Sequence, residues 1–352
     1  QYLMVGVVSL LKSIFCSVLT LLSLGAFAQK EVVLKDKSAD KKVEVTIDGK
    51  PFTAYFYPGP DVLKKAVLYP LRTANGTDIT RGWPIDPRPG ERVDHPHHVG
   101  MWLNYEAVNG HDFWNNSLSV NHGKGTYGTI VHTGIKSMKS GKKQGELTVT
   151  ADWLDKNGAL MLTETTSYVF SGDANTRTVD RSTTLTAKTD VTFKDVKDGM
   201  FAIRVARQLE HPSKSPDVFT DASGVATKVP VMDNAGVSGS YRSSEGIEGE
   251  DVWSKRARWC NLRGKMGNET VNLVIIDHPK NVGYPTYWHA RGYGLFAANP
   301  LGMKVFSNGK EELNLQLKNG ESTTFRYRTV IASETLSDEK INQMAADFGK
   351  VK

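Results

Sequence analysis

Residues 145–170, GELTVTADWLDKNGALMLTETTSYVF, decide the fold class of this chain. Apolar and polar residues alternate on both sides of Asn157-Gly158, a dipeptide typical of a tight turn between two strands. Because successive side chains of a strand point to opposite faces, this alternation indicates strands with one buried face each. The stretch therefore predicts a long β-hairpin.

Strand patterns of the same kind cover most of the chain. Residues 43–57 alternate around the turn Asp48-Gly49, and β-branched residues fill 175–193. Further runs lie at 269–277, 293–299 and 311–332. About 320 residues of meandering strands suit one large sandwich of two sheets better than several small modules.

One segment near the C-terminus predicts a helix. Ser337 is a candidate N-cap, and Asp338 and Glu339 suit the first turn. The apolar residues that follow fall on one helical face: Ile341, Met344, Ala345 and Phe348. The predicted fold class is all-β, a large β-sandwich with a short C-terminal helix.

The composition is that of an ordinary globular protein, with 39% hydrophobic and 23% charged residues among 352. The net charge is +6, but basic and acidic residues are interleaved and no dense basic helix occurs. We therefore expect no nucleic-acid partner. Two weakly structured stretches, 73–98 and 221–253, are long for loops and favour a functional lid or rim.

Residues 1–28 have the features of a secretory signal peptide. An apolar run follows Lys12, and Ala26 and Ala28 are the small residues expected before a cleavage site after Ala28. The remaining 29–352 would form a single exported domain, periplasmic or extracellular, with no apolar stretch of membrane-spanning length. Cys260 would be its single cysteine, which excludes an intramolecular disulfide framework.

The stretch DHPHHVG, residues 94–100, contains three of the nine histidines. In an extended segment His95 and His97 project to the same side, as metal-ligand pairs on β scaffolds do, while His98 points the other way. A divalent metal is therefore one interpretation, with Asp94 as ligand or as acceptor for an imidazole N–H. Further ligands would come from a distant residue: His132, Glu164, His278 or His289.

Two other interpretations of the histidines stay open. They can line a metal-free pocket, where one imidazole acts as general acid or base on a sugar. They can also form a hydrogen-bonded structural corner without catalytic role.

The residues that follow suit a carbohydrate site. Trp102 and Trp114 offer rings on which a sugar can stack, and Asn109 and Asp112 offer partners for its hydroxyls. The alternative is that the tryptophans are core residues of two strands around the Asn109-Gly110 turn.

Two later blocks add charged and aromatic residues. Trp288, His289 and Arg291 stand in a Gly/Pro-rich stretch that could close the same pocket, with Arg291 binding a carboxylate, keto oxygen or enediolate. Arg204 lies inside the apolar run MFAIRVA and needs a partner, either an acidic ligand or an internal acid such as Glu164.

The order TRGWP, GERVDHPHHVGMWLNYEAVNGHDFW, KDGMFAIRVA, RWCNLRG and DHPKNVGYPTYWHARGYGLFAANPLG resembles the PmoA-like family of exported bacterial proteins, often called methane oxygenase PmoA. The resemblance runs from about residue 45 to 332 and implies a large β-sandwich with the histidine block in its cleft. The layout is also similar to the supersandwich of mutarotase relatives. An integral membrane oxygenase does not fit a chain without apolar spans.

These observations predict an exported carbohydrate-active enzyme: a hydrolase, lyase or epimerase on a sugar or keto-sugar, with or without a metal. A histidine of the cluster would move a proton, with Glu164 or Asp94 as partner carboxylate. Arg204 or Arg291 would steady negative charge, and Trp114 and Trp288 would stack the ring. A non-catalytic sugar-binding module and a metal-dependent oxidoreductase are the alternatives.

Overall fold

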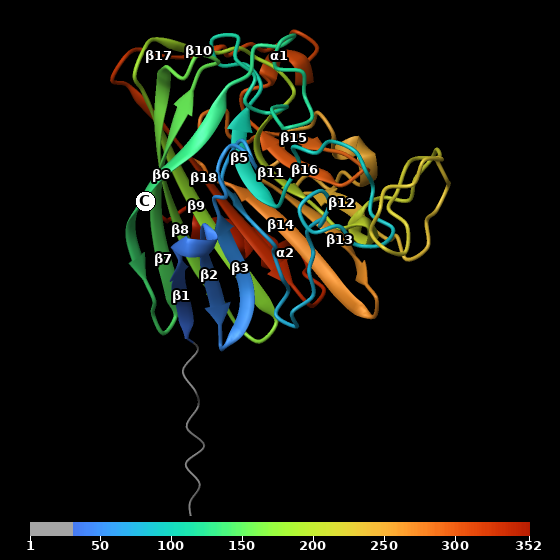
Figure 1. Cartoon of the computed structure of the whole chain (residues 1–352). Coiled ribbons are helices and arrows are strands. Elements are labelled where there is room, and N and C mark those ends of the chain that lie inside the picture. The colour runs from blue at the N-terminus through green and yellow to red at the C-terminus, as the bar shows by residue number, and fades with distance from the viewer. Residues whose placement is uncertain (1–30) are drawn as a thin grey trace, which may run out of the picture.

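The computed structural model of the chain describes residues 31–352 (Figure 1). The predicted signal peptide and its cleavage site lie outside these residues. Two eight-stranded antiparallel sheets pack face to face. In spatial order the first sheet contains β1 (Val32–Lys37), β2 (Lys42–Ile47), β3 (Lys50–Phe56), β4 (Val67–Leu68), β5 (Met101–Tyr105), β11 (Gly199–Arg204), β16 (Leu295–Asn299) and β15 (Tyr287–Ala290).

The second sheet is built largely from the long strands in the middle of the chain. Its spatial order is β12 (Ser240–Ser243), β13 (Trp259–Met266), β14 (Glu269–Asp277), β18 (Ser322–Ala332), β9 (Thr176–Ala187), β8 (Leu160–Gly172), β7 (Gln144–Leu154) and β6 (Thr129–Lys139). Outside the two sheets lie the small pair β10 (Val191–Phe193) and β17 (Leu315–Leu317), the helices α1 (Met303–Phe306) and α2 (Asp338–Phe348), and three short 3-10 helices at Ser38–Asp40, Arg207–Leu209 and Gly249–Val252.

Both predicted hairpins are present. β7 and β8 pair from Gln144↔Ser171 to Leu154↔Leu160, and Gly158 in their turn has φ +83°. β2 and β3 meet at Asp48 (φ +52°) and Gly49 (φ +75°), the left-handed pair that a tight hairpin requires.

The core between the sheets explains why alternation was the decisive pattern. Leu147 and Phe170 face inward from the second sheet, and Phe201 from the first sheet stacks on Tyr327 at 4.7 Å. All four side chains are fully buried. The all-β sandwich is therefore confirmed, and so is the C-terminal helix, where the Ser337 hydroxyl accepts a hydrogen bond from the Lys340 N–H at 3.2 Å.

A second apolar cluster covers the outer face of the first sheet. It is centred on Trp102, Ala202 and Ala297, which stand side by side on β5, β11 and β16. Segment 58–100 supplies Leu63 and Val99 to the same cluster. Ile85 packs against the cluster too, so the irregular stretch 73–98, which carries the histidines, lies against this sheet.

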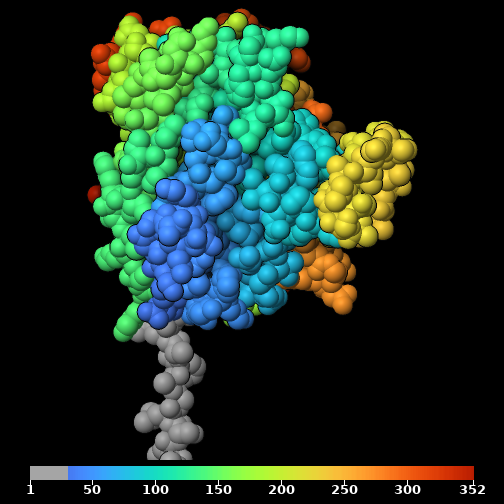
Figure 2. Space-filling view, in the orientation of Figure 1, coloured from blue at the N-terminus to red at the C-terminus, as the bar shows by residue number. Residues whose placement is uncertain are grey.

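The two halves of the long connection 221–253 lie in different parts of the molecule. Its second half contains β12, which joins the edge of the second sheet. The first half projects from the body, where Figure 2 shows it in yellow. Val225 and Val229 there are 61% and 67% exposed. Among residues 31–352 no helix is long and apolar enough to cross a membrane.

Candidate functional site

The histidine loop enters β5 through a sharp turn. The His98 N–H donates to the carbonyl of His95 at 2.9 Å, and His95 has φ +43°. Gly100 has φ +59°, and a Cβ there would stand 2.3 Å from the carbonyl oxygen of Leu68. A non-glycine residue with positive φ is uncommon and is enriched at functional sites. The backbone of His95 is such a position.

Arg81 fixes the shape of this loop. Its side chain is buried, and Nη1 donates to the carbonyl of Asp94 at 2.7 Å and to that of Arg92 at 3.2 Å. Nη2 donates to the carbonyls of His95 at 2.8 Å and His98 at 3.1 Å. The planar guanidinium therefore ties four backbone positions of the histidine loop together.

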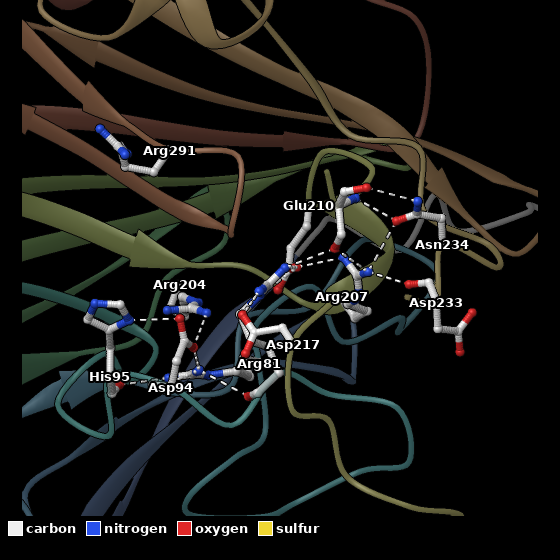
Figure 3. Close-up of polar contacts among 12 residues, drawn as sticks. Arg81, Asp94, His95, Arg204, Arg207, Glu210, Asp217, Asp233, Asn234 and Arg291 are labelled. Carbon is white, nitrogen blue, oxygen red and sulfur yellow. Dashed lines mark hydrogen bonds and ion pairs between the residues drawn. The ribbon is translucent and has the colours of Figure 1, made fainter. Parts of the chain in front are cut away.

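The Asp94 carboxylate stands among three basic side chains (Figure 3). Its Oδ1 accepts from Arg81 at 2.7 Å and from Arg204 at 2.5 Å, and Oδ2 lies 2.7 Å from Nδ1 of His95. Burial raises the pKa of Asp94, but the two guanidiniums and the bond to His95 outweigh it and hold that pKa well below its usual range. Asp94 is thus an ionised acceptor at neutral pH.

His95 is held in place and still reachable. Its ring stacks on Tyr293 at 5.0 Å on one side and on His98 at 4.7 Å on the other. The side chain is 41% exposed. Because the Asp94 carboxylate can only accept, Nδ1 donates to it, and Nε2 has no hydrogen-bond partner among residues 31–352. This is the arrangement of an imidazole base oriented by a carboxylate.

His98 and the tryptophans beneath it are structural. Nδ1 of His98 accepts from Arg204 at 3.1 Å, and its ring stacks on Trp102 at 5.3 Å. Burial holds the pKa of His98 well below its usual value. Trp102 and Trp114 are 0% and 1% exposed, so neither offers a ring face to a sugar. This burial does not favour the predicted roles of His98 in proton transfer and of both tryptophans in substrate binding.

His97 faces another side of the loop. It lines a hollow of about 400 Å³, together with Lys65 and Trp83. Its Nε2 is buried without a hydrogen-bond partner, and burial and the neighbouring Lys65 lower its pKa. The centres of the His95 and His97 rings, which were predicted to converge, are 5.7 Å apart, and the ring planes are 79° from parallel.

Residues 288–293 contact the histidine loop, residues 94–100, through the ring of Tyr293, which stacks on His95. The Arg291 guanidinium lies 5.9 Å from the Tyr293 ring and 5.5 Å from the Trp253 ring. His289 accepts at Nδ1 from the Trp253 indole at 2.9 Å, and its Nε2 lies 3.2 Å from the Asp198 carboxylate. Arg291 thus reaches the histidine loop through Tyr293, whose ring stacks on His95, while His289 bonds Trp253 and Asp198.

Acidic residues gather next to His289. Burial, followed by the nearby Asp198 and Asp112, raises the pKa of Glu106 to about 7. Asp112 itself accepts from the N–H and the side-chain amide of Asn115 at 2.8 and 2.9 Å. Its carboxylate shapes this turn and is not a free substrate ligand.

A second ionic network runs from the loop before Asp94 to the projecting segment (Figure 3). The buried Glu210 carboxylate accepts from Arg92 at 3.2 Å and from Arg207 at 2.7 Å. Arg92 also pairs with Asp217, and Arg207 donates to the carbonyl of Asp233 at 2.5 Å. These contacts attach the base of the projection to the site loop.

The sequence comparison places the chain in a family. Residues 42–346 match the profile of a family of unknown function, DUF6807. This chain belongs to the DUF6807 family. No curated protein matches it.

Several solved structures are similar to this DUF6807 protein at low sequence identity. The galactosidase domain of an α-galactosidase–sucrose kinase matches with TM-score 0.40 and 11% identity over 87% of this chain and 42% of that one. A GH36 α-galactosidase from Geobacillus stearothermophilus gives 0.40 and 11% over 86% and 41%. Galactose 1-epimerase from Lactobacillus acidophilus NCFM gives 0.35 and 12% over 87% and 100%. The DUF6807 chain thus spans about two fifths of the galactosidase chains.

Three predicted residues lie elsewhere in the DUF6807 protein. Glu164 is buried on β8 in the second sheet, where it pairs with Arg181 at 3.2 Å and not with Arg204. Trp288 is buried against the inner core and donates to the carbonyl of Ala257 at 3.1 Å. Asn109 uses its amide to hold the backbone of β10. These placements do not favour their predicted roles as partner carboxylate, stacking ring and hydroxyl partner.

The residues of the loop do not fit a metal site. Among residues 31–352 no group of three or more His, Cys, Asp or Glu side chains is arranged to hold an ion. His132 lies on β6 and bonds the Tyr55 hydroxyl, and His278 bonds the carbonyl of Val351. Arg81 and Arg204 beside the imidazoles also disfavour a cation. We therefore route no chemistry through a metal.

Sequence reasoning missed four residues of the site: Arg81, Tyr293, Trp253 and Lys65. Arg81 and Tyr293 stand inside the stretches TRGWP and HARGYG, which drew attention for other residues. Lys65 lies in LKKAV, which reads as an exposed charged pair. An arginine that binds backbone carbonyls and a lysine buried beside an indole leave no periodic signal in a single sequence.

Proposed function

We propose that this chain is an exported enzyme that moves a proton on a carbohydrate or keto-sugar, as a hydrolase, lyase or epimerase. The observation that carries the proposal is the Asp94–His95 pair. Its imidazole has one nitrogen bonded to an ionised carboxylate at 2.7 Å and the other free on a 41% exposed side chain. Such a ring takes a proton at Nε2 and later returns it.

The surroundings of His95 give the other roles. Arg291 lies 5.9 Å from the ring of Tyr293, on which the imidazole stacks, and would steady an oxyanion or enediolate that forms when the proton leaves. Asp198, His289 and Trp253 form a hydrogen-bonded group near Arg291 that suits sugar hydroxyls. Arg204 is a positioning residue, because it acts on His95 through Asp94.

Turnover of glycosides and keto-glycosides by the parent and by His95→Gln tests the proposal. His111→Gln is the matched control, because His111 lies at the β5–β6 turn and bonds only the carbonyl of Asn109. We expect His95→Gln to lose a factor of about 10² to 10⁴ in kcat with the fold retained, and His111→Gln to match the parent.

Full turnover by His95→Gln would remove this residue from catalysis. Saturable sugar binding without turnover by the parent would support the binding-module alternative. Elemental analysis of the purified protein addresses the oxidoreductase alternative, which requires a redox metal at about one per chain.

A further inference from the structure

The hollow beside His97 contains a buried cation without an anionic partner. Lys65 is 4% exposed, and its ammonium donates to the carbonyl of His97 at 2.6 Å and lies 5.1 Å from the centre of the Trp102 ring. None of the ion pairs among residues 31–352 includes Lys65. A buried ammonium needs an opposite charge or it loses its proton. Burial indeed lowers the pKa of Lys65 to about 7.

The same hollow is lined by an imidazole nitrogen that lacks a hydrogen-bond partner. His97 is 8% exposed, lines the hollow, and its buried Nε2 has no hydrogen-bond partner. Buried polar atoms are normally paired, so an unpaired imidazole nitrogen beside an ammonium that lacks a counter-charge indicates a place for a ligand. The two groups offer an ammonium and an imidazole nitrogen, which together suit a carboxylate.

The other residues that line the hollow suit a ligand of the size of a monosaccharide. Trp83 lines the hollow as a partly exposed ring, with the Arg81 guanidinium 5.1 Å from its centre. Ser117 and Ser119 contribute hydroxyl groups, and Leu118 contributes an apolar rim that is 59% exposed. A volume of about 400 Å³ lies in the range of small-molecule sites.

We propose that this hollow binds a monosaccharide acid of the uronate type, with its carboxylate paired to Lys65 and bonded to His97 and its ring against Trp83. The site is separate from the proton-transfer chemistry of His95 and does not depend on it. The acidic partner restores the ammonium state of Lys65. A neutral sugar leaves that group unpaired and binds more weakly.

Titration calorimetry with glucuronate and galacturonate tests this site, with glucose as the neutral match and inorganic phosphate as the other anion. We expect a uronate to bind the parent at least tenfold more tightly than either control ligand. Lys65→Met should weaken that binding at least tenfold. Lys50→Met, which removes an exposed charge outside the hollow, should change it by no more than about threefold.

A second experiment measures the proton that the protein takes up when uronate binds. At pH 8, uronate binding to the parent should take up a proton, seen as a dependence of the heat on the ionisation enthalpy of the buffer, and Lys65→Met should lack it. A thermal unfolding curve checks that Lys65→Met is folded. His95→Gln should bind uronate as the parent does. A loss of turnover in this variant would therefore not count against the uronate site.

Three results would overturn the proposal. One is a uronate affinity no higher than that for glucose, or no uronate binding at all. Another is unchanged binding by folded Lys65→Met. The third is tighter binding of phosphate than of either uronate, which would make the hollow a phosphate site.

Discussion

The rings of His95 and Tyr293 stack 5.0 Å apart and within 5° of parallel. This contact joins a loop that precedes β5 to the turn between β15 and β16, almost 200 residues later in the chain. The imidazole is clamped between Tyr293 and His98, so its free nitrogen has a fixed direction. A base with a fixed direction needs little reorganisation to take a proton.

Asp94→Asn should destabilise the protein by about 3 kcal/mol at pH 7, because Arg81 and Arg204 would stay buried without their shared counter-charge. The pKa of Asp94 is lowered in the fold, so its contribution is present above the unfolded value of 3.8 and is lost as the pH falls below it. Urea unfolding should show a constant difference from pH 8 to 5 that shrinks below pH 4. Asp61→Asn, at an exposed position, is the control; an equal effect of both substitutions would contradict the assignment.

Arg81→Lys should loosen the histidine loop although the charge is kept. A lysine ammonium cannot bind four backbone carbonyls in one plane as the guanidinium does. Hydrogen exchange of residues 92–98 should accelerate at least tenfold, with β7 and β8 unaffected. Arg72→Lys, in a partly exposed ion pair with Asp78, should leave that exchange unchanged. Protection that survives in Arg81→Lys would show that other contacts hold the loop.

Lys65→Met should change how stability depends on pH. The pKa of Lys65 is about 7 in the fold and 10.5 in the unfolded chain, so between these values the unfolded chain binds more protons. The unfolding free energy of the parent should therefore rise with pH relative to Lys65→Met, by up to about 1.4 kcal/mol per pH unit. Denaturant titrations at pH 7.5 and 9.5 measure it. Parallel pH profiles of the two proteins would mean that Lys65 keeps its proton in the fold.

Glu106→Gln should stabilise the protein at mildly alkaline pH and not at acidic pH. The pKa of Glu106 is raised from 4.5 to about 7, so its favourable contribution is present below pH 4.5 and is lost as the pH rises through 7. Glu106 is only half-buried, so we expect a gain of about 1 kcal/mol at pH 8 and none at pH 4.5. Thermal unfolding at both pH values measures this gain. Glu334→Gln, at an exposed position, should show neither change.

The fold was predictable because its signals are local. Alternation and turn dipeptides marked β2, β3, β7 and β8, and the N-cap at Ser337 marked α2, since each depends on neighbours a few residues away. The placement of 73–98 was not predictable. It depends on Arg81 and on an apolar cluster assembled from β5, β11 and β16.

The site was predictable only where a residue type narrows its own choices. Arg204 in an apolar strand had to have an acidic partner, and it has one, but periodicity could not choose Asp94 over Glu164. Both acids are largely buried and each pairs with an arginine. Which sheet carries each pair is a property of the topology, and a single sequence does not display it.

Cys260 on β13 has no exposed surface, and burial holds the pKa of its thiol well above the usual value. In protein that lacks residues 1–28 it is the one cysteine of the chain. The folded protein should therefore not react with thiol reagents. A cysteine placed at Leu118, on the rim of the hollow, becomes a unique labelling position, and a fluorophore there would report occupancy without background.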